Sequence, residues 1–431
     1  MKKLVVLLMV VSLLAIPAAV QAQTTSTAFQ VVNLNSSAAA NIVVTFYDLN
    51  GSTSYTMNDT IGAGASKTYI QSAMSGVPSG FNGSVVISSD QSIASIVNQS
   101  TTGSAIYNGS YTGFSSGSTS FYLPVILNNY YGYHTEISIQ NAGSSPVNVT
   151  VSYSTAGCTD TKSSLAVGAA VRFSNTTTCS GGLNGNGSAT ISATGPVVAV
   201  VNQIAGSSPG PARNMEQTYN GFSTSDGAPT LYSPIALNAY YGFNTSFQVQ
   251  NIGSGPMNIT ATYSDGKVAT VNNVAAGKAA TFLQNQEGHA ASWTGSAVIT
   301  NNTGQNMVGI VNQASSAMAA SFNMFAAGAT TWALPSLLKS YYTYNSAFQV
   351  QNISGGPVNV TVTYDDGKTA SANNVANNNV ATFIQKNETH ANGWAGSARV
   401  TATGNVVVVV NQDSTQTGAD YMYSYNGVPL P

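Results

Sequence analysis

The heptapeptide "VNVTVTY", residues Val358–Tyr364, alternates apolar and polar side chains without interruption. Its first, third, fifth and seventh residues are Val or Tyr, and the residues between them are Asn or Thr. Successive side chains of a β-strand point to opposite faces, so this period of two predicts a strand with one buried face. The segment that follows, "DDGK" (residues 365–368), contains the Asp-Gly dipeptide that favours a tight β-hairpin turn.

The same strand pattern recurs in three other places along the chain. It appears as "ANIVVTF" (residues 40–46), "VNVTVSY" (147–153) and "MNITATY" (257–263). A second phrase, "VNQ", ends at intervals of roughly 100 residues, at Gln99, Gln203, Gln313 and Gln412. Self-similarity at a fixed period is the sequence signature of a repeat architecture. The chain after its first residues therefore contains four copies of one unit.

Each copy contains several short strand-like segments and no sustained helical periodicity. A unit of roughly 100 residues with this pattern is typical of an immunoglobulin-like β-sandwich. The sequence therefore predicts an all-β protein of four tandem immunoglobulin-like β-sandwich domains in a row. One alternative stays open, a single β-propeller with two blades per repeat, which would be a compact ring. The expected divisions are a signal peptide at residues 1–22 and repeats at 23–125, 126–236, 237–337 and 338–431.

The N-terminal residues indicate export. Lys2 and Lys3 supply a positive start, Leu4–Ile16 an apolar core, and a small-residue cleavage site ends at Ala22. We expect no lipid anchor, no membrane span in the mature chain and an extracellular or cell-surface location. Only 6% of residues are charged, which argues against a basic nucleic-acid-binding surface.

Tyrosines cluster where one copy is predicted to meet the next. The clusters occur in "LNNYYGYHT" (residues 127–135), "LNAYYGFNT" (237–245) and "LKSYYTYNS" (338–346), and the first copy has none. Tyrosine suits an interface because its ring is apolar and its tip is polar. We expect an inter-domain junction formed by Tyr130, Tyr131, Tyr133, Tyr240, Tyr241, Phe243, Tyr341, Tyr342 and Tyr344. The alternative is that these rings are ordinary core residues.

The two cysteines, Cys158 and Cys179, are predicted to form a structural disulfide, because the chain is expected to be exported. Glycosylation sequons recur at one point of the repeated strand, at Asn148, Asn258 and Asn359. These asparagines fall on its polar face and would be accessible to modification. The same residues also suit the polar face of an uncharged strand, so both interpretations stay open.

A histidine–tryptophan pattern repeats in the last two copies. His289 and His390 each follow a glutamate by two residues and precede Trp293 and Trp394 by four. Core packing is the expected role, and stacking of the tryptophans on a ligand is the alternative. We expect no metal site, because a metal requires three or four converging ligands. The sequence shows no catalytic set, so we expect no enzymatic activity and no cofactor.

A resemblance covers all four copies. The phrases "YNGFS" (residues 219–223), "IQNAGSSPVNVTVSY" (139–153) and "VVAVVNQ" (197–203) resemble the tandem repeats of secreted surface proteins in filamentous, Chloroflexi-type bacteria. The overall design also resembles subunits of extracellular fibres and surface layers built from immunoglobulin-like domains. The resemblance implies location and architecture rather than a catalytic role.

The first functional hypothesis is a structural subunit of an extracellular filament or cell-surface coat. It would form a homopolymer head to tail, through β-domain contacts or strand exchange between subunits. The chain ends at Leu430-Pro431, a pair that precedes the tyrosine cluster elsewhere, so the junction between subunits is expected to differ from the internal ones. The alternative is a secreted adhesin or glycan-binding module that contacts surface glycans.

Overall fold

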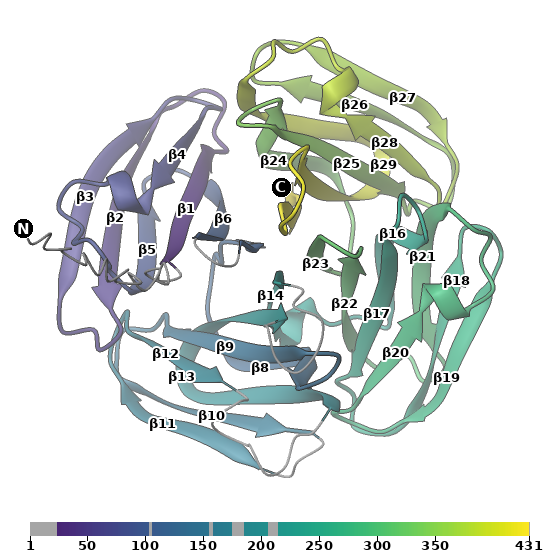
Figure 1. The fold of residues 1–431 in the computed structure, drawn as a ribbon, viewed down its shortest axis with the longest axis horizontal. Helices are drawn as coiled ribbons and strands as arrows, with labels where there is room; N and C mark the ends of the chain where they lie inside the picture. Colours follow the sequence, from purple (N-terminus) through teal and green to yellow (C-terminus); the bar gives the residue numbers. More distant parts are fainter. Residues whose placement is uncertain (1–23, 103–105, 155–157, 175–184, 206–213, 431) are drawn as a thin grey trace, which may run out of the picture.

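The computed structural model describes residues 24–102, 106–154, 158–174, 185–205 and 214–430. Apart from four single-turn 3-10 helices, its regular elements are β-strands, and they form four β-sandwiches (Figure 1). The prediction of an all-β protein with four tandem sandwiches is confirmed, and the propeller alternative is wrong. No helix in the described part of the chain is long and apolar enough to cross a bilayer.

The third repeat shows the complete sandwich most simply. One four-stranded sheet has the order β16-β21-β18-β19, and the other has the order β20-β17-β22-β23, with all pairs antiparallel. The strands are β16 (Thr230–Asn238), β17 (Asn244–Asn251), β18 (Met257–Tyr263), β19 (Val268–Val274), β20 (Ala279–Leu283), β21 (Trp293–Asn301), β22 (Met307–Ala314) and β23 (Ala319–Asn323). Phe247, Ile259, Ile299 and Val311 are fully buried between the two sheets.

The second and fourth repeats have the same plan, but one long strand joins their two sheets. The first half of β13 (Gly185–Ala205) pairs with β8 and β10, and its second half pairs with β9 and β14. In the fourth repeat β29 (Trp394–Ser414) is shared in the same way. The other strands are β8 (Ser118–Asn128), β9 (Tyr133–Asn141), β10 (Val147–Tyr153), β11 (Thr159–Leu165), β12 (Ala170–Ser174), β14 (Met215–Asn220), β15 (Phe222–Ser223), β24 (Ala329–Lys339), β25 (Tyr344–Asn352), β26 (Val358–Tyr364), β27 (Thr369–Val375), β28 (Val380–Ile384), β30 (Met422–Asn426) and β31 (Val428–Pro429).

The first repeat has one strand fewer among its described residues. Its sheets have the orders β4-β1-β6-β7 and β3-β2-β5, so β5 pairs only with β2. The counterpart of β5 in each other repeat also pairs with a first strand, β8, β16 or β24. The strands are β1 (Thr24–Asn33), β2 (Ala40–Asp48), β3 (Ser54–Ile61), β4 (Ser66–Ile70), β5 (Gly83–Ser89), β6 (Ile93–Thr102) and β7 (Asn108–Thr112).

The first strand of a sandwich lies upstream of the boundary predicted from the sequence. β8 begins at Ser118 and β16 at Thr230, whereas the second and third repeats were predicted to begin at residues 126 and 237. Each first strand thus belongs to the repeat that follows it. At the other end of the chain, Val428 pairs with Ala333 of β24, in the way that Phe222 pairs with Tyr122 of β8. Leu430-Pro431 therefore does not correspond to the Leu-Pro pair of a first strand.

One buried asparagine is used identically in all four repeats. Asn33, Asn141, Asn251 and Asn352 end β1, β9, β17 and β25. The side-chain amide of Asn251 donates to the carbonyl oxygens of Gly255 (2.8 Å) and Val274 (2.8 Å), and the other three make equivalent bonds, with one more from Asn33 to Gly62. Buried backbone carbonyls require such partners. This requirement accounts for the asparagine at the end of "FQVQN" and of its counterpart "FQVVN" in the first copy.

The four sandwiches are arranged around a common centre rather than in a row (Figure 1). The strand that follows the "VNQ" strand in each repeat (β7, β14, β23 or β30) lies at this centre. β14 contacts β7 and β23, and β30 contacts β23 and β7. The first and fourth repeats are therefore neighbours. There Asn108 Nδ2 donates to the hydroxyl of Tyr344 (3.0 Å), and the backbone N–H of Ser424 donates to Ser110 Oγ (3.0 Å). The expectation of a linear row of domains is corrected by these contacts.

The "VNQ" phrase joins neighbouring repeats. Gln313 Nε2 donates to Asn411 Oδ1 (2.8 Å), and Asn411 Nδ2 donates to Gln313 Oε1 (3.1 Å). Gln203 and Asn312 form the same reciprocal pair, and Asn202 Nδ2 donates to Gln99 Oε1 (3.0 Å). Gln412, in contrast, donates to Ser336 of its own repeat. The phrase thus links the first repeat to the second, the second to the third and the third to the fourth.

Candidate binding surface

Three tyrosine pairs lie at the tips of equivalent β-hairpins. In the third repeat, Tyr240 and Phe243 exchange backbone hydrogen bonds (3.0 and 2.9 Å), and Tyr241 and Gly242 form the two-residue turn between them. Tyr130 to Tyr133 and Tyr341 to Tyr344 close the same turn in the second and fourth repeats. Each turn connects the first strand of its repeat to the second, so the first repeat, which has no such strand among its described residues, has no tyrosine turn there.

The second tyrosine of each pair is presented to solvent. The exposed fractions are 82% for Tyr131, 86% for Tyr241 and 81% for Tyr342. Each ring packs edge-on against the tyrosine before it, with ring centroids 4.6, 4.7 and 4.8 Å apart. This packing leaves most of the exposed ring free to contact another molecule. Burial, followed by the neighbouring Tyr131, raises the pKa of Tyr130, so the phenol stays neutral at physiological pH.

The exposed tyrosines have an unfavourable backbone conformation. Their φ angles are +51°, +48° and +44° for Tyr131, Tyr241 and Tyr342. A two-residue hairpin turn of this type requires positive φ at both central positions, which Gly, Asn and Asp adopt at low cost. A bulky residue there costs on the order of 1 kcal/mol. Stability alone therefore does not explain why tyrosine occupies the position in all three turns.

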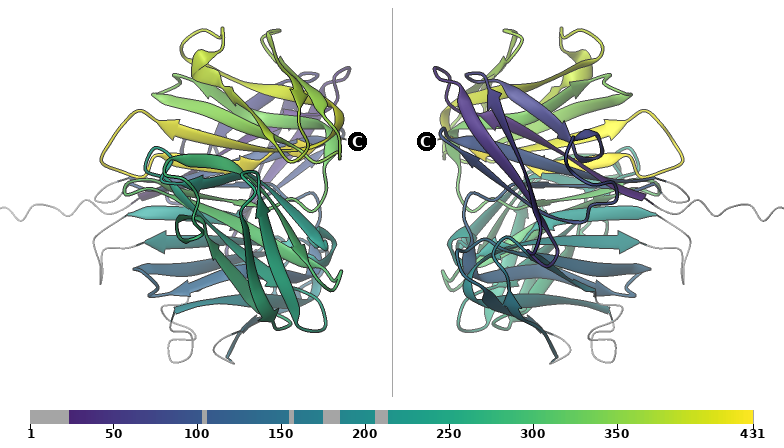
Figure 2. Two further views of the ribbon diagram at one scale, coloured as in Figure 1. Left: turned by 90° about the vertical axis from the view of Figure 1, so that its right-hand side faces the viewer. Right: turned by 90° about the vertical axis from the view of Figure 1, so that its left-hand side faces the viewer.

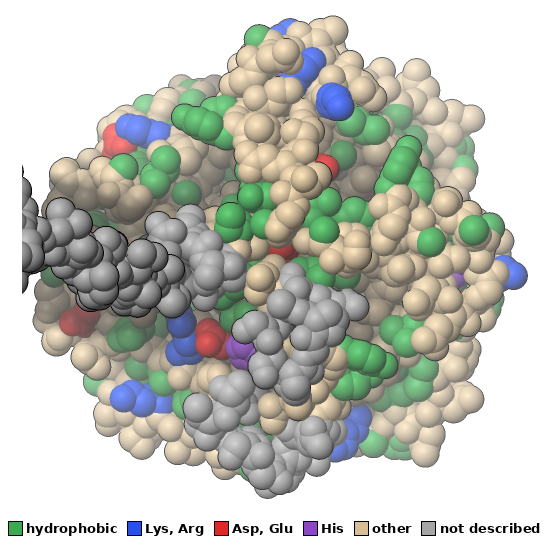
Figure 3. Space-filling view, in the orientation of Figure 1, with side chains coloured by type: hydrophobic (Ala, Val, Ile, Leu, Met, Phe, Trp, Pro, Cys, Tyr) green, Lys and Arg blue, Asp and Glu red, His purple; other side chains and the backbone are tan. Residues whose placement is uncertain are grey.

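The three turns lie on one face of the molecule. Each turn lies beside the end of the strand that carries "VNQ", because Tyr133 pairs with Ala205, Asn244 with Ala314, and Tyr344 with Ser414. From that end the chain continues to the central strand of the same repeat. The repeats are arranged around a centre, so equivalent ends point to the same side (Figure 2). A space-filling view of the molecule shows separate hydrophobic patches on a largely uncharged surface (Figure 3).

The predicted junction residues have different locations. Tyr344 does lie between repeats, because Asn108 of the first repeat donates to its hydroxyl and Tyr423 packs beside it. Tyr133 is buried, and Phe243 and Tyr240 are half-buried at the edge of a core. Tyr131, Tyr241 and Tyr342 are too exposed to lie between two repeats of this chain. These three residues were predicted to lie at a junction between domains, and the structure places them in solvent-facing turns instead.

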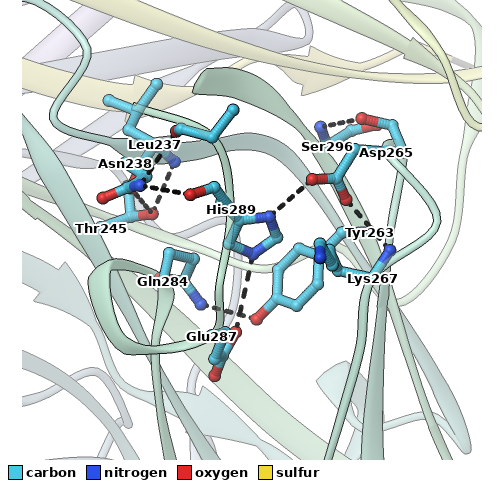
Figure 4. Close-up of polar contacts among 12 residues, drawn as sticks. Leu237, Asn238, Thr245, Tyr263, Asp265, Lys267, Gln284, Glu287, His289 and Ser296 are labelled. Carbon is cyan, nitrogen blue, oxygen red and sulfur yellow. Dashed lines mark hydrogen bonds and ion pairs between the residues drawn. The ribbon is translucent and has the colours of Figure 1, made fainter. Parts of the chain in front are cut away.

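The histidine–tryptophan pattern forms a packed cluster, and Figure 4 shows the polar contacts of its histidine, His289, with Asp265 and Glu287. The rings of His289 and Trp293 stack with centroids 4.0 Å apart and planes 5° apart, and Tyr263 packs edge-on against both. His289 Nδ1 lies 2.7 Å from Asp265 Oδ2, and Gln284 Nε2 donates to the Tyr263 hydroxyl (2.7 Å). The fourth repeat builds the same cluster around His390 and Trp394.

The carboxylate of each cluster is electrostatically stabilised. Burial alone would raise the pKa of Asp366, but hydrogen bonds from Lys368 and His390 lower it to about 2. The pKa of Asp265 is also lowered, because the contact with His289 and the Lys267 N–H outweigh its burial. Burial raises the pKa of Tyr263 far above its usual value. These groups form a structural network that connects the Asp-Gly turn to the aromatic cluster.

The clusters do not resemble catalytic or ligand-stacking sites. The side chains of His289 and His390 are fully buried, and each imidazole covers one face of its tryptophan. A tryptophan that stacks on a sugar needs an accessible ring face, so the geometry favours core packing for Trp293 and Trp394. Among the described residues, no group of three His, Cys, Asp or Glu side chains is placed to hold a metal ion.

The three sequon asparagines have a structural role. The side-chain oxygens of Asn148, Asn258 and Asn359 accept from the backbone N–H groups of Ser164, Asn273 and Asn374, all at 2.9 Å. Each of these donors has a positive φ and lies next to a shift in strand register. The asparagines thus stabilise a β-bulge, and glycosylation at them stays a prediction. Cys158 is described, but Cys179 lies outside the described residues, so the disulfide also stays a prediction.

Two buried carboxyl groups near the centre were not anticipated from the sequence. Glu216 is the second residue of β14, and Thr218 Oγ1 donates to its carboxylate (3.2 Å). Asp420 accepts from the backbone N–H groups of Glu216 (2.9 Å) and Ala319 (3.0 Å) and so joins three repeats. Burial raises the pKa of Glu216 to about 7 and raises that of Asp420 strongly. Both lie in loop-adjacent segments that carry no local sequence pattern.

Comparison with known proteins identifies no family for this chain. No family model matches the sequence, and no curated protein matches it significantly. Among solved structures, the chain is weakly similar to a tetra-tandem repeat in the extending region of a large adhesion protein. That match has 12% sequence identity and a TM-score of 0.11 and covers 95% of this chain and 99% of the other. A similarity of this size supports no conclusion about fold or function.

Proposed function

We propose that this protein is a non-catalytic, extracellular binding module that attaches through its three tyrosine turns to carbohydrate on a surface. The observation that carries the proposal is the presence of Tyr131, Tyr241 and Tyr342 on one face, each more than four-fifths exposed and each at a positive φ. Exposed tyrosines supply a large, rigid contact area with a polar tip and lose little conformational entropy on binding.

Carbohydrate is the ligand class that this surface fits best. The C–H faces of sugars pack on aromatic rings, and sugar hydroxyls form hydrogen bonds with tyrosine hydroxyls and with the Asn and Ser side chains that surround the turns. A nucleic acid would require a basic surface, and only 12 of the 431 residues are Lys or Arg. Three equivalent weak sites on one rigid body would bind a repetitive polymer with much higher avidity than a single sugar.

The test is binding to a glycan array and to isolated polysaccharides. We expect saturable binding by the secreted protein and loss of binding by the triple variant Tyr131→Ala, Tyr241→Ala, Tyr342→Ala. The matched control is Tyr47→Ala, which changes a tyrosine outside the three turns. Equal binding by wild type and the triple variant, with both proteins folded by circular dichroism, would refute the proposal.

A second function is supported by a different observation: among the described residues, one edge of β5 in the first repeat has no strand partner. We propose that the protein also serves as a structural subunit of a cell-surface coat or extracellular filament, since an open strand edge favours pairing with another chain. Electron microscopy of native material should show polymers or ordered arrays; isolated particles at every concentration would contradict this role.

The remaining expectations are part of the same proposal. We propose that the chain is exported and cleaved after Ala22, that Cys158 and Cys179 form a disulfide, and that the protein belongs with secreted surface proteins of Chloroflexi-type bacteria. Mass spectrometry of the secreted protein tests the first two directly, through the N-terminal residue and the mass change on reduction and alkylation. It also reveals any glycan on Asn148, Asn258 or Asn359.

A further inference from the structure

Each first strand covers two surfaces at once. In the second repeat, β8 pairs with β13 of its own sandwich and also contacts β17 and β22 of the third repeat. β16 makes the same contacts with β25 and β29 of the fourth repeat, and β24 makes them with β1 and β6 of the first. A first strand therefore completes its own core and fills the boundary to the next repeat.

In the part of the chain that the structure describes, no first strand covers the core of the first repeat. Its residues Val85, Ile87 and Val97 are only half-buried. The residues at the position of Ile87 in the other repeats, Ile191, Ile299 and Val400, are fully buried. The same holds for the position of Val97, which Val201, Val311 and Val410 occupy. The difference marks the place where a first strand would lie.

The facing side of the second repeat is uncovered in the same way. Val198 and Val200 of β13 are half-buried, although their counterparts are fully buried: Val308 and Ile310 in the third repeat and Val407 and Val409 in the fourth. We call Val85, Ile87, Val97, Val198 and Val200 the uncovered strip. It runs along the boundary between the first and second repeats and is bordered by the edge of β5 that has no partner among the strands the structure describes.

The boundary itself has its normal spacing. Ser84 Oγ donates to the carbonyl oxygen of Gly168 across it, and Ser188 Oγ donates to Gly277 at the corresponding point between the second and third repeats. The same serine-to-carbonyl contact is present at both boundaries. The first and second repeats are therefore placed relative to each other as the second and third are, although no described strand fills the boundary between them. Among the described residues, therefore, no strand lies between the apolar walls of this boundary.

The internal first strands define the chemistry of an occupant. Their central segments are Leu123-Pro124-Val125-Ile126-Leu127, Ser233-Pro234-Ile235-Ala236-Leu237 and Leu334-Pro335-Ser336-Leu337-Leu338. In each, the residue before the proline and the second and third residues after it are buried or nearly so. The proline falls where the register shifts, so pairing with β5 would not require its missing N–H.

We infer that the uncovered strip is an acceptor for an extended segment of a partner polypeptide with the pattern x-Pro-x-apolar-apolar. The segment pairs antiparallel with β5 and inserts its apolar residues between the first and second repeats, as β8 does one repeat later. This inference deepens the proposed structural role by naming the acceptor and the donor chemistry, and it is independent of the tyrosine turns.

Residues 16–20 of this chain, Ile-Pro-Ala-Ala-Val, carry the same pattern and lie outside the described residues. Cleavage after Ala22 would remove them, and the strip would then need a donor in trans. If the secreted chain retained them, they would be the donor in cis. The experiment below separates these two occupants.

The probe is a fluorescent peptide of residues Ser118–Asn128, and the control peptide carries Leu123→Asp and Ile126→Asp. The N-terminal residue of the secreted protein is determined first, and peptide binding is then followed by fluorescence polarisation. We expect saturable binding of the probe, at least about 10-fold weaker binding of the control, and new hydrogen-exchange protection of the β5 amides. The variant Val200→Lys should weaken binding, and Val43→Lys, on the outer face of β2, should not.

Three results would overturn the inference. These are equal binding of the two peptides, protection at strands other than β5, and a retained N-terminus with β5 amides that are already protected without peptide. Peptide binding without any native polymer would leave the acceptor strip in place and would refute only the filament role. Loss of peptide binding in Val200→Lys, with glycan binding unchanged, would separate the strip from the tyrosine surface.

Discussion

Gln203 and Asn312 exchange two side-chain hydrogen bonds, 3.1 and 3.0 Å long, across the boundary between the second and third repeats. Gln203 is fully buried and Asn312 nearly so. Amide groups of this kind stabilise a protein only when both partners are present, because a lone buried amide loses its hydrogen bonds to water. The pair therefore fixes the position of one sandwich relative to the next.

Replacing one partner of this pair should destabilise the protein. We expect Gln203→Ala to lower the free energy of unfolding by roughly 1–3 kcal/mol, because the side-chain N–H of Asn312 is left buried without its acceptor, while Ser321 Oγ still donates to Asn312 Oδ1. Urea unfolding followed by circular dichroism measures the change. Gln99→Ala is the matched control, since Gln99 is only half-buried and should cost less. Equal decreases in the free energy of unfolding in the two variants would show that the reciprocal hydrogen bonds contribute no more to stability than the single bond of Gln99.

Glu216 should make the protein less stable as pH rises. Its pKa in the folded protein is about 7, raised by burial from an ordinary value of 4.5, so the folded state holds its proton more tightly than the unfolded state. Stability is therefore lost as pH increases from about 4.5 through 7. Glu216→Gln removes this loss, and we expect the variant to gain up to a few kcal/mol on wild type at pH 8 and little at pH 4.

Thermal or urea unfolding at several pH values measures this difference. Asp420 also makes the protein less stable as pH rises, because burial raises its pKa as well. The Glu216→Gln variant should therefore retain the part of the pH dependence that comes from Asp420. The matched control is Glu388→Gln, which removes a half-buried carboxylate that follows the 3-10 helix Gln385–Asn387 of the fourth repeat. Parallel stability curves for wild type and Glu216→Gln would show that Glu216 is not the titrating group.

The turn of the fourth repeat should be stabilised by glycine. Thr343 has a φ of +75°, whereas the equivalent residues of the other turns are Gly132 and Gly242, at +81° and +82°. A β-branched residue is strained at such an angle. We expect Thr343→Gly to raise the free energy of unfolding by about 0.5–1 kcal/mol, and Gly242→Thr to lower it by at least as much. Changes of the same sign in both variants would contradict the role assigned to φ.

Trp293 should contribute to stability rather than to binding. Its ring is stacked on His289 and packs against Tyr263. We expect Trp293→Ala to lower the free energy of unfolding by about 3 kcal/mol, with glycan binding unchanged below the unfolding temperature. Trp394→Ala, in the same environment, should behave alike. A binding defect in either variant at a temperature where it is fully folded would restore the ligand-stacking interpretation.

The strands were predictable because their information is local. The alternation of Val358–Tyr364 directly predicts which residues are buried, and Val358, Val360, Val362 and Tyr364 are indeed in the core. The relation between repeats was not predictable in this way. "VNQ" is visible as a repeated phrase, but which Asn meets which Gln depends on the arrangement of whole sandwiches around the centre.

The tyrosine turns were located in the sequence but assigned the wrong environment for their exposed residues. "YYG" lacks the Asn-Gly or Asp-Gly that favours this turn. Nothing local indicates that Tyr241 would take a positive φ and point to solvent. The uncovered strip was equally invisible, because half-buried Val198 and fully buried Val308 occupy equivalent strands and differ only in what the preceding repeat provides.

The central claim, that three tyrosine turns bind one repetitive surface together, is tested most directly by comparing single, double and triple Tyr→Ala variants at positions 131, 241 and 342. Binding to an immobilised polysaccharide is measured beside binding to its short soluble fragment. Avidity predicts that each substitution weakens immobilised binding by a further factor, about 10² or more in total, while the remaining turns bind the fragment as before. A triple variant that binds the immobilised polysaccharide as tightly as wild type would contradict the account.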